Sequence, residues 1–200
     1  MSILSIVTDE KAFLASSRFL PVYFDTVFRR IFDDSEDCFL LKSMLNALLH
    51  LQGPRTITSL SLRKRDLPGL RAEDKESIVD INAIDGAGHR FNIEMQVNAQ
   101  TFYHARAVFY LSLLHSSQLE NGEGYRELLP TVGLHFLCFD LFERQQFPGV
   151  HAIFELKERH DGRRFSDQLQ LHTLEEGVVK EGKRVPTELP GTSPLLLPSP

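Results

Sequence analysis

The sequence predicts a single α/β domain in which helices flank a mixed central sheet. Two consecutive strand-like segments are joined by the short glycine-containing stretch 86–88, which is typical of an antiparallel hairpin. A helical segment then leads to the almost wholly apolar run 131–139, as expected for a crossover into a strand covered on both faces. With the helical periodicity before residue 53, these segments give the order αβββαβ.

Length and composition are those of one ordinary globular domain. The chain has 200 residues, of which 42% are hydrophobic and 24% charged, close to the average for such proteins. It contains no apolar run of about 18 residues and no signal peptide, so a cytoplasmic location is expected. The net charge of −5, from 22 Lys and Arg against 27 Asp and Glu, does not favour nucleic-acid binding.

The chain divides into three parts. We expect an N-terminal extension at residues 1–20, the folded domain at 21–176 and a disordered tail at 177–200, where five of the ten prolines lie. The two cysteines, Cys38 and Cys138, lack the close Cys or His spacing of a zinc site. They are therefore expected to be buried free thiols.

Two amphipathic helices are predicted before the first strand. Apolar residues recur at helical spacing from Leu20 to Phe32 and again from Cys38 to Leu51, and the second pattern stops at Gly53-Pro54. The second helix should bury one face, made of Leu41, Met44, Leu45, Leu48 and Leu49.

A third helix is predicted from Ala99 to Glu120, with Phe102, Ala105, Phe109 and Leu113 on one face. The segments with strand character are Thr56–Leu62, Ser77–Asp85, His89–Val97, Thr131–Phe139, Val150–Leu156 and Phe165–Leu174.

The predicted hairpin separates polar from apolar side chains. Along its second strand, Arg90, Asn92, Glu94 and Gln96 alternate with Phe91, Ile93, Met95 and Val97, so the two sets point to opposite faces. A three-residue loop with a left-handed glycine places Asp85 opposite His89, and hence Asp80 opposite Glu94.

Two carboxylates directly opposed on neighbouring strands lie about 5 Å apart at Cβ and repel each other. A divalent cation between Asp80 and Glu94 removes that repulsion. The repulsion between the two carboxylates is equally well relieved if this face is exposed and both side chains extend into water. The residues alone leave both interpretations open.

Asp80, a short turn and then Glu94-Met95-Gln96 resemble the D…(D/E)-x-K signature of the PD-(D/E)XK nuclease superfamily. A longer stretch is similar to one branch of it, the PD-(D/E)XK nuclease family transposases, also described as recombination-promoting nucleases. The similar pieces follow one another from about Phe24 to Leu174: Asp25-Thr-Val-Phe28-Arg29, Leu45-Asn46-Ala47-Leu48-Leu49, Val79-Asp80-Ile81, Gly88 to Gln96, Phe102…Arg106…Tyr110, Gln118-Leu119, Leu129-Pro130 and Phe165-Ser-Asp167. Gln96 stands where most superfamily members carry Lys, and glutamine resembles the usual form of this branch.

This resemblance implies a restriction-endonuclease-like core and a site on the hairpin. Asp80 and Glu94 would bind Mg²⁺, with Mn²⁺ as a substitute, and Gln96 would orient the attacking water. Asp25 would add a further metal ligand, although an ion pair with Arg29 one helical turn away is an equal alternative. Arg106 would contact a substrate phosphate, or else form a salt bridge to an acid of the site.

The function that the resemblance implies is a bacterial, Mg²⁺-dependent DNA endonuclease associated with transposition or recombination. The alternative is a catalytically decayed or truncated relative that acts as a binding or assembly module, and Gln96, the acidic net charge and the proline-rich tail favour it. A transposase that joins strands also stays open. DNA is the expected partner, a membrane is not, and a homodimer is an option that the residues do not decide.

Overall fold

The computed structural model describes residues 28, 31–32, 38–63, 81–143, 145 and 147–175. Two predicted site residues, Asp25 and Asp80, lie outside these ranges, as do the expected N-terminal extension and C-terminal tail. Of the first predicted helix, Phe28, Ile31 and Phe32 are described, and all three are helical.

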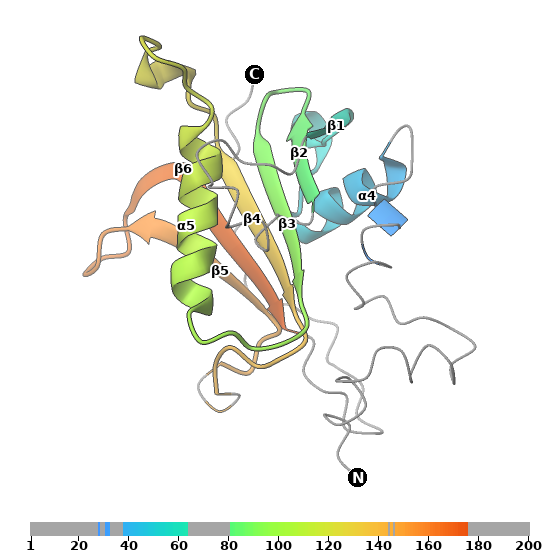
Figure 1. Ribbon diagram of the computed structural model, residues 1–200, viewed down its shortest axis with the longest axis vertical. Coiled ribbons are helices and arrows are strands. Elements are labelled where there is room, and N and C mark those ends of the chain that lie inside the picture. Colours follow the sequence, from blue (N-terminus) through green and yellow to red (C-terminus); the bar gives the residue numbers. More distant parts are fainter. Residues whose placement is uncertain are drawn as a thin grey trace, which may run out of the picture.

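A six-stranded mixed sheet forms the centre of the molecule, in the order β1-β2-β3-β4-β6-β5 (Figure 1). Of the helices whose bounds the structure describes, α4 packs on one face and α5 on the other. The elements are α4 (Phe39–Leu48), β1 (Leu60–Arg63), β2 (Ile81–Asp85), β3 (Arg90–Gln96), α5 (Tyr103–Ser116), β4 (Thr131–Leu137), β5 (His151–Lys157) and β6 (Arg164–Glu175), with short 3-10 turns at Gly53–Arg55 and Tyr125–Glu127. The predicted mixed α/β fold is confirmed.

The hairpin of β2 and β3 has the register that the glycine loop predicts. The Asp85 amide donates to the His89 carbonyl at 3.2 Å, and Gly88 has a φ of +92°. That left-handed conformation suits glycine, which has no Cβ to clash with the backbone. The described pairs run from Ile84 with Arg90 to Ile81 with Ile93.

Helix α5 is the predicted crossover connection. It carries the chain from the end of β3 to the start of β4, which pairs parallel with β3. β4 is also parallel to β6, so its backbone is paired on both sides. The outer strand β5 pairs antiparallel with β6, with irregular register between Glu155 and Lys157.

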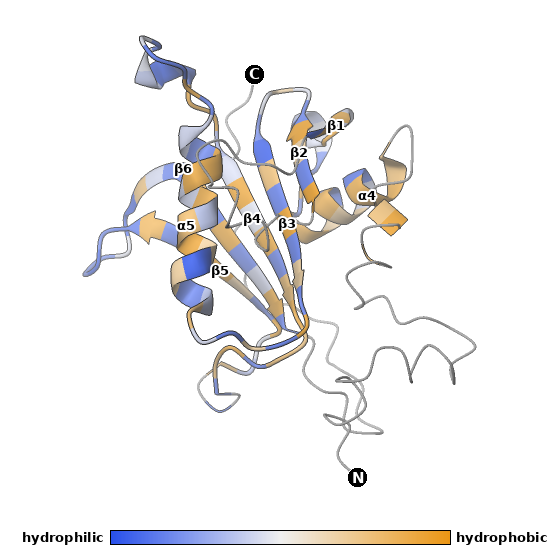
Figure 2. Cartoon of the chain, viewed as in Figure 1, coloured by the Kyte–Doolittle hydropathy of each residue, from blue (hydrophilic) through white to orange (hydrophobic). Residues whose placement is uncertain are grey.

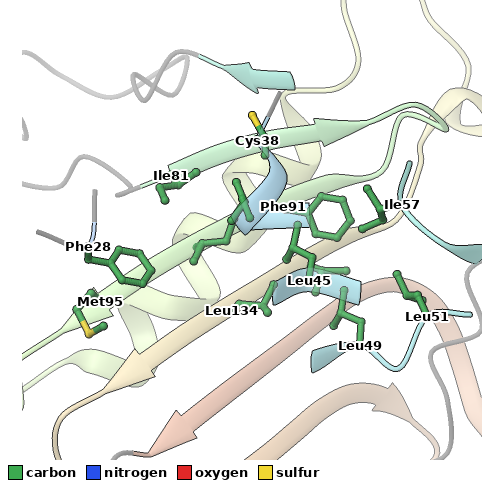
Figure 3. Packing of buried hydrophobic residues seen from close by; sticks show 14 residues of the cluster. Phe28, Cys38, Leu45, Leu49, Leu51, Ile57, Ile81, Phe91, Met95 and Leu134 are labelled. Carbon is green, nitrogen blue, oxygen red and sulfur yellow. The ribbon is translucent and has the colours of Figure 1, made fainter. Parts of the chain in front are cut away.

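The main hydrophobic core lies between α4 and the sheet (Figure 3). Leu41 and Leu45 of α4 are fully buried against Phe91 and Ile93 of β3. The predicted apolar face of α4 is confirmed, because Met44, Leu48 and Leu49 also pack in this cluster. Asn46 holds the next segment in place, accepting from the Ile57 amide at 2.8 Å and donating to its carbonyl at 3.0 Å.

The predicted face of α5 was wrong. Phe102 and Phe109 are 73% and 52% exposed, whereas the helix buries Tyr103, Ala107, Tyr110, Leu111 and Leu114. Apolar side chains surround this helix almost completely, so its periodicity does not single out one face. The sheet decides the orientation, since Tyr103 and Ala107 pack on Leu137.

Neither cysteine forms a disulfide bond, and Cys38 is buried whereas Cys138 is half-buried. Within the described ranges, no helix is long and apolar enough to cross a membrane.

Candidate active site

Glu94 lies on β3, on the face of the sheet opposite to the main core. Its neighbours Phe91, Ile93 and Met95 point into that core, which confirms the predicted alternation. Hydrophilic and hydrophobic residues accordingly alternate along the strands of the hairpin in Figure 2. The polar side is not open to water, however, because Glu94 is only 7% exposed. The interpretation of this face as polar side chains extended into water was therefore wrong for Glu94.

Two side-chain amides hold the Glu94 carboxylate. Asn92 donates to one oxygen at 3.0 Å, and Gln96 donates to the other at 3.4 Å. All three side chains come from alternate positions of one strand, so strand geometry alone brings them together. A buried carboxylate needs such donors because the loss of its hydration is costly. Glu94 is thus fixed in position, with Gln96 beside it.

His135 is the neighbour of Glu94 on the next strand, where the two residues are paired in the parallel register of β3 and β4. Its ring is buried, and Nδ1 lies 2.9 Å from the Tyr103 hydroxyl of α5. Burial lowers the pKa of His135, the negative charge of Glu94 opposes that shift, and Arg106 adds to it. A neutral His135 ring can accept a hydrogen bond from the Tyr103 hydroxyl at Nδ1.

Tyr103, in the first turn of α5, covers the sheet around Glu94 and His135. Burial raises the pKa of its hydroxyl, and the charges of Glu94 and Glu175 raise it further. Glu175 ends β6 and is 3% exposed, and its partner in the ladder is Leu137, which in turn pairs with Gln96. Two carboxylates and two uncharged ring side chains therefore share the space beneath the first turn of α5.

Three of these residues were missed in the sequence. Tyr103 lies on the helix face that the periodicity did not select. His135 is the one ring nitrogen donor within the apolar run 131–139, and Glu175 is a lone acid ending an alternating strand. A polar residue inside an apolar strand is the signal that could have found the last two, because buried polar groups need partners.

Arg106 forms no salt bridge to an acid among the described residues, so that one of its two predicted roles is not seen there. Its guanidinium donates to the Gln100 side chain and lies 5.7 Å from the centre of the Tyr110 ring. No acid of the described part of the chain forms an ion pair with it. The predicted proximity of Arg106 and Tyr110 on the helix is correct, and a phosphate contact stays a prediction.

The remaining predicted site residues, Asp25 and Asp80, lie outside the described residues. The pairing of Asp80 with Glu94 therefore stays a prediction. It continues the register of the described hairpin by one residue beyond Ile81 and Ile93.

A divalent cation fits the chemistry of this face. Glu94 supplies a buried carboxylate on a rigid strand, and Mg²⁺ needs only one or two protein carboxylates together with water and phosphate oxygens. Among the described residues, no three His, Cys, Asp or Glu side chains are grouped closely enough to hold a metal by themselves. A cation held by Glu94 would therefore need oxygen ligands beyond the described residues, such as a further acid, water or substrate oxygens.

Comparison with protein families identifies the chain. The profile of the PD-(D/E)XK nuclease family transposases matches residues 22–187. The chain belongs to this family. No curated protein and no solved structure matches it. The mixed six-stranded sheet agrees with the restriction-endonuclease-like fold of PD-(D/E)XK proteins. Membership supports a nuclease linked to transposition, with DNA as its partner and with the divalent metals that such nucleases generally use.

Proposed function

We propose that this family member is a Mg²⁺-dependent DNA endonuclease, in which Asp80, Glu94 and Gln96 form the catalytic group. The observation that carries the proposal is the fixed Glu94 carboxylate beside Gln96 on a hairpin strand within the range 22–187 that the family profile matches. We further propose that it acts in transposition or recombination, and that Mn²⁺ can replace Mg²⁺.

Each residue has a defined task. Asp80 and Glu94 bind the cation, and Asp25 is the proposed additional ligand. When bound, the cation stabilises negative charge on the scissile phosphate and lowers the pKa of the attacking water. The Gln96 amide accepts and donates hydrogen bonds, so it orients that water without contributing charge. Asn92 keeps the Glu94 carboxylate in one orientation, since its amide is 3.0 Å from it.

The buried partners keep this face acidic. Tyr103 stays protonated and His135 stays neutral at pH 7, because burial raises the pKa of the first and lowers that of the second. The charge beneath α5 therefore comes from Glu94 and Glu175 rather than from His135. A negatively charged carboxylate favours a divalent cation and disfavours phosphate, so a bound cation would offset the repulsion between Glu94 and the scissile phosphate.

Plasmid nicking tests the proposal. The purified wild-type protein, Glu94→Gln and Asp80→Asn are each incubated with supercoiled plasmid and Mg²⁺, beside a reaction with EDTA. We expect nicking by the wild type only, reduced at least a hundredfold in both variants, because each loses the charge that binds the cation. Glu127→Gln is the matched control, since Glu127 is 61% exposed on its side chain and distant in sequence from the hairpin.

Equal nicking by Glu94→Gln and the wild type would contradict the site. A second candidate function is a non-catalytic binding module, which the absence of a positive charge at Gln96 favours. A non-catalytic binding module predicts that the wild type binds DNA but does not nick it in the presence of Mg²⁺ or Mn²⁺.

A further inference from the structure

The face that carries Glu94 continues across the hairpin onto β1. Arg90 lies on the same side of β3 as Asn92 and Glu94, four residues before Glu94. In the described register, Arg63 pairs with Asn82, and Asn82 pairs with Asn92. Paired residues of antiparallel strands point to the same face, so Arg63 also lies on the side of Glu94.

Burial confirms this assignment for β1. Leu60 and Leu62 pack against the main core, whereas Ser61 and Arg63, which alternate with them along the strand, are exposed. The inward and outward sides of this strand are therefore fixed. Arg63 and Arg90 are separated by two strand spacings across the sheet, roughly 10 Å, and by two residues along the strands, roughly 7 Å. Two long side chains can bridge this separation.

The two guanidinium groups have no acidic partner among the described residues. Burial lowers the pKa of Arg90, and the positive charge of Arg63 lowers it further. The Arg90 Nε atom is buried, and within the described residues it finds no hydrogen-bond acceptor. On the neighbouring strand β2, the Asp85 carboxylate is engaged by His89 at 2.8 Å. The two arginines thus repel each other on one face of the sheet. An anion bound between them would replace this repulsion with attraction.

This part of the sheet is not beneath α5. The helix packs against β3, β4 and β6, and Figure 1 shows it lying to the side of the sheet away from β1 and β2. Arg63 is exposed, and Arg90 is half-buried at the border of the covered region. An anion can therefore approach the pair from the open side of the hairpin.

We propose that Arg63 and Arg90 bind the phosphates of duplex DNA and direct the backbone along β3 toward Glu94. The inference rests on the proposed function, because it takes DNA as the substrate of the same face. Guanidinium groups suit this task, since their planar donors match phosphate oxygens in pairs. Four residues of extended strand separate Arg90 from Glu94, about 14 Å. That length corresponds to roughly four nucleotides of a duplex strand along its axis.

DNA binding in EDTA separates this inference from catalysis, because cleavage is then blocked. We would titrate a fluorescein-labelled duplex with the full chain and record anisotropy at several salt concentrations. Arg63→Gln and Arg90→Gln should each weaken binding roughly tenfold and, for any DNA sequence, lower the salt slope by about one. Arg126→Gln, on an exposed turn, should change neither.

Unchanged affinity and salt slope in the Arg63→Gln/Arg90→Gln double variant would overturn the proposal, as would a wild type that binds no duplex. Arg63 is exposed, so its single variant tests the idea even if the half-buried Arg90 variant fails to fold. DNA binding that depends on the two arginines, without nicking, would contradict the proposed nuclease activity and support the proposed DNA-binding surface. Nicking without arginine-dependent binding would support the nuclease activity and contradict the DNA-binding surface.

Discussion

At the scale of single residues, the buried Glu94 carboxylate is the feature on which the site depends. The sequence predicted its strand and its face, because alternation fixes both. Its burial could not be predicted, since a periodic pattern does not tell what covers a polar face. Helix α5 and its Tyr103 provide that cover, and they come from a segment whose orientation the sequence left undecided.

Asn92→Ala should impair both stability and nicking. The substitution removes the donor that lies 3.0 Å from Glu94 and leaves a buried carboxylate with one hydrogen bond fewer. Loss of such a bond to a buried charge costs about 1–3 kcal/mol, to be measured by urea unfolding. Because the carboxylate is then free to rotate, nicking should fall more than tenfold under conditions where the variant is fully folded.

Asn46→Ala is the matched control for Asn92. Asn46 makes two hydrogen bonds to Ile57 on the opposite side of the sheet, so its loss should cost a similar free energy of unfolding. It does not touch the candidate site, and the folded variant should nick at the wild-type rate. If the two variants lose nicking in proportion to their stability, Asn92 has no role beyond folding.

At the scale of elements, the hairpin of β2 and β3 is the best-predicted part of the fold. Its glycine loop fixes the register, and the register fixes which side chains face Glu94. Helix α5 is the opposite case. Its position as a crossover was predicted correctly, yet its buried face was not, because packing on Leu137 rather than its own periodicity decides the rotation.

Gly88→Ala should destabilise the hairpin. At a φ of +92° an alanine costs about 1–2 kcal/mol of backbone energy, and its Cβ would in addition meet the Cδ1 atom of Leu129. Thermal unfolding measures the loss. Gly162→Ala is a suitable comparison, since Gly162 has a φ of +70° and open space around it.

The difference between the two glycine variants isolates the contact with Leu129. We expect Gly88→Ala to have the lower melting temperature. Equal melting temperatures would show that the Leu129 side chain moves aside without cost, and that the hairpin tolerates the change as easily as the β5–β6 turn.

At the scale of the whole molecule, buried histidines make stability depend on pH. His172 of β6 is 1% exposed, and its Nδ1 lies 2.9 Å from Nε2 of His151 on β5. Burial lowers the pKa of His172 from 6.5 to about 3, His151 and His50 add to the shift, and Glu155 opposes it. The pKa of His151 is lowered as well, chiefly by burial.

The sign of the effect follows from these shifts. A histidine whose pKa is lower in the folded state binds its proton more readily when unfolded, so its stabilising contribution is complete above pH 6.5 and is lost as the pH falls. His172 alone should account for about 2 kcal/mol between pH 8 and pH 5. Urea unfolding across this range measures the loss.

A His172→Asn variant should show a smaller loss of stability on acidification than the wild type, even if it is less stable at pH 8. His160→Asn, in the exposed turn before β6, should retain the full wild-type dependence. An identical pH dependence in wild type and His172→Asn would show that other groups control acid stability.

The strand order is the part of the whole molecule that the sequence did not reveal. Each strand was recognised by its own pattern. However, β6 lies between β4 and β5 in the sheet, so β4 pairs with β6 rather than with β5, the next strand in the sequence. Such long-range pairing leaves no local signal, because the side chains of β6 alternate as those of any half-buried strand do. Glu175 reaches the space beneath α5 only through this arrangement.

The position of β6 between β4 and β5 also bears on how the chain is made. β4 and β5 both leave the ribosome before β6, yet in the described structure β6 is the strand that pairs with each of them. Until it emerges, the outer edge of β4 presents an unpaired and strongly apolar strand, a template for association with other nascent chains. We therefore expect an interval during synthesis in which a chaperone can protect β4, and that interval ends when residues 164–175 have emerged from the ribosome.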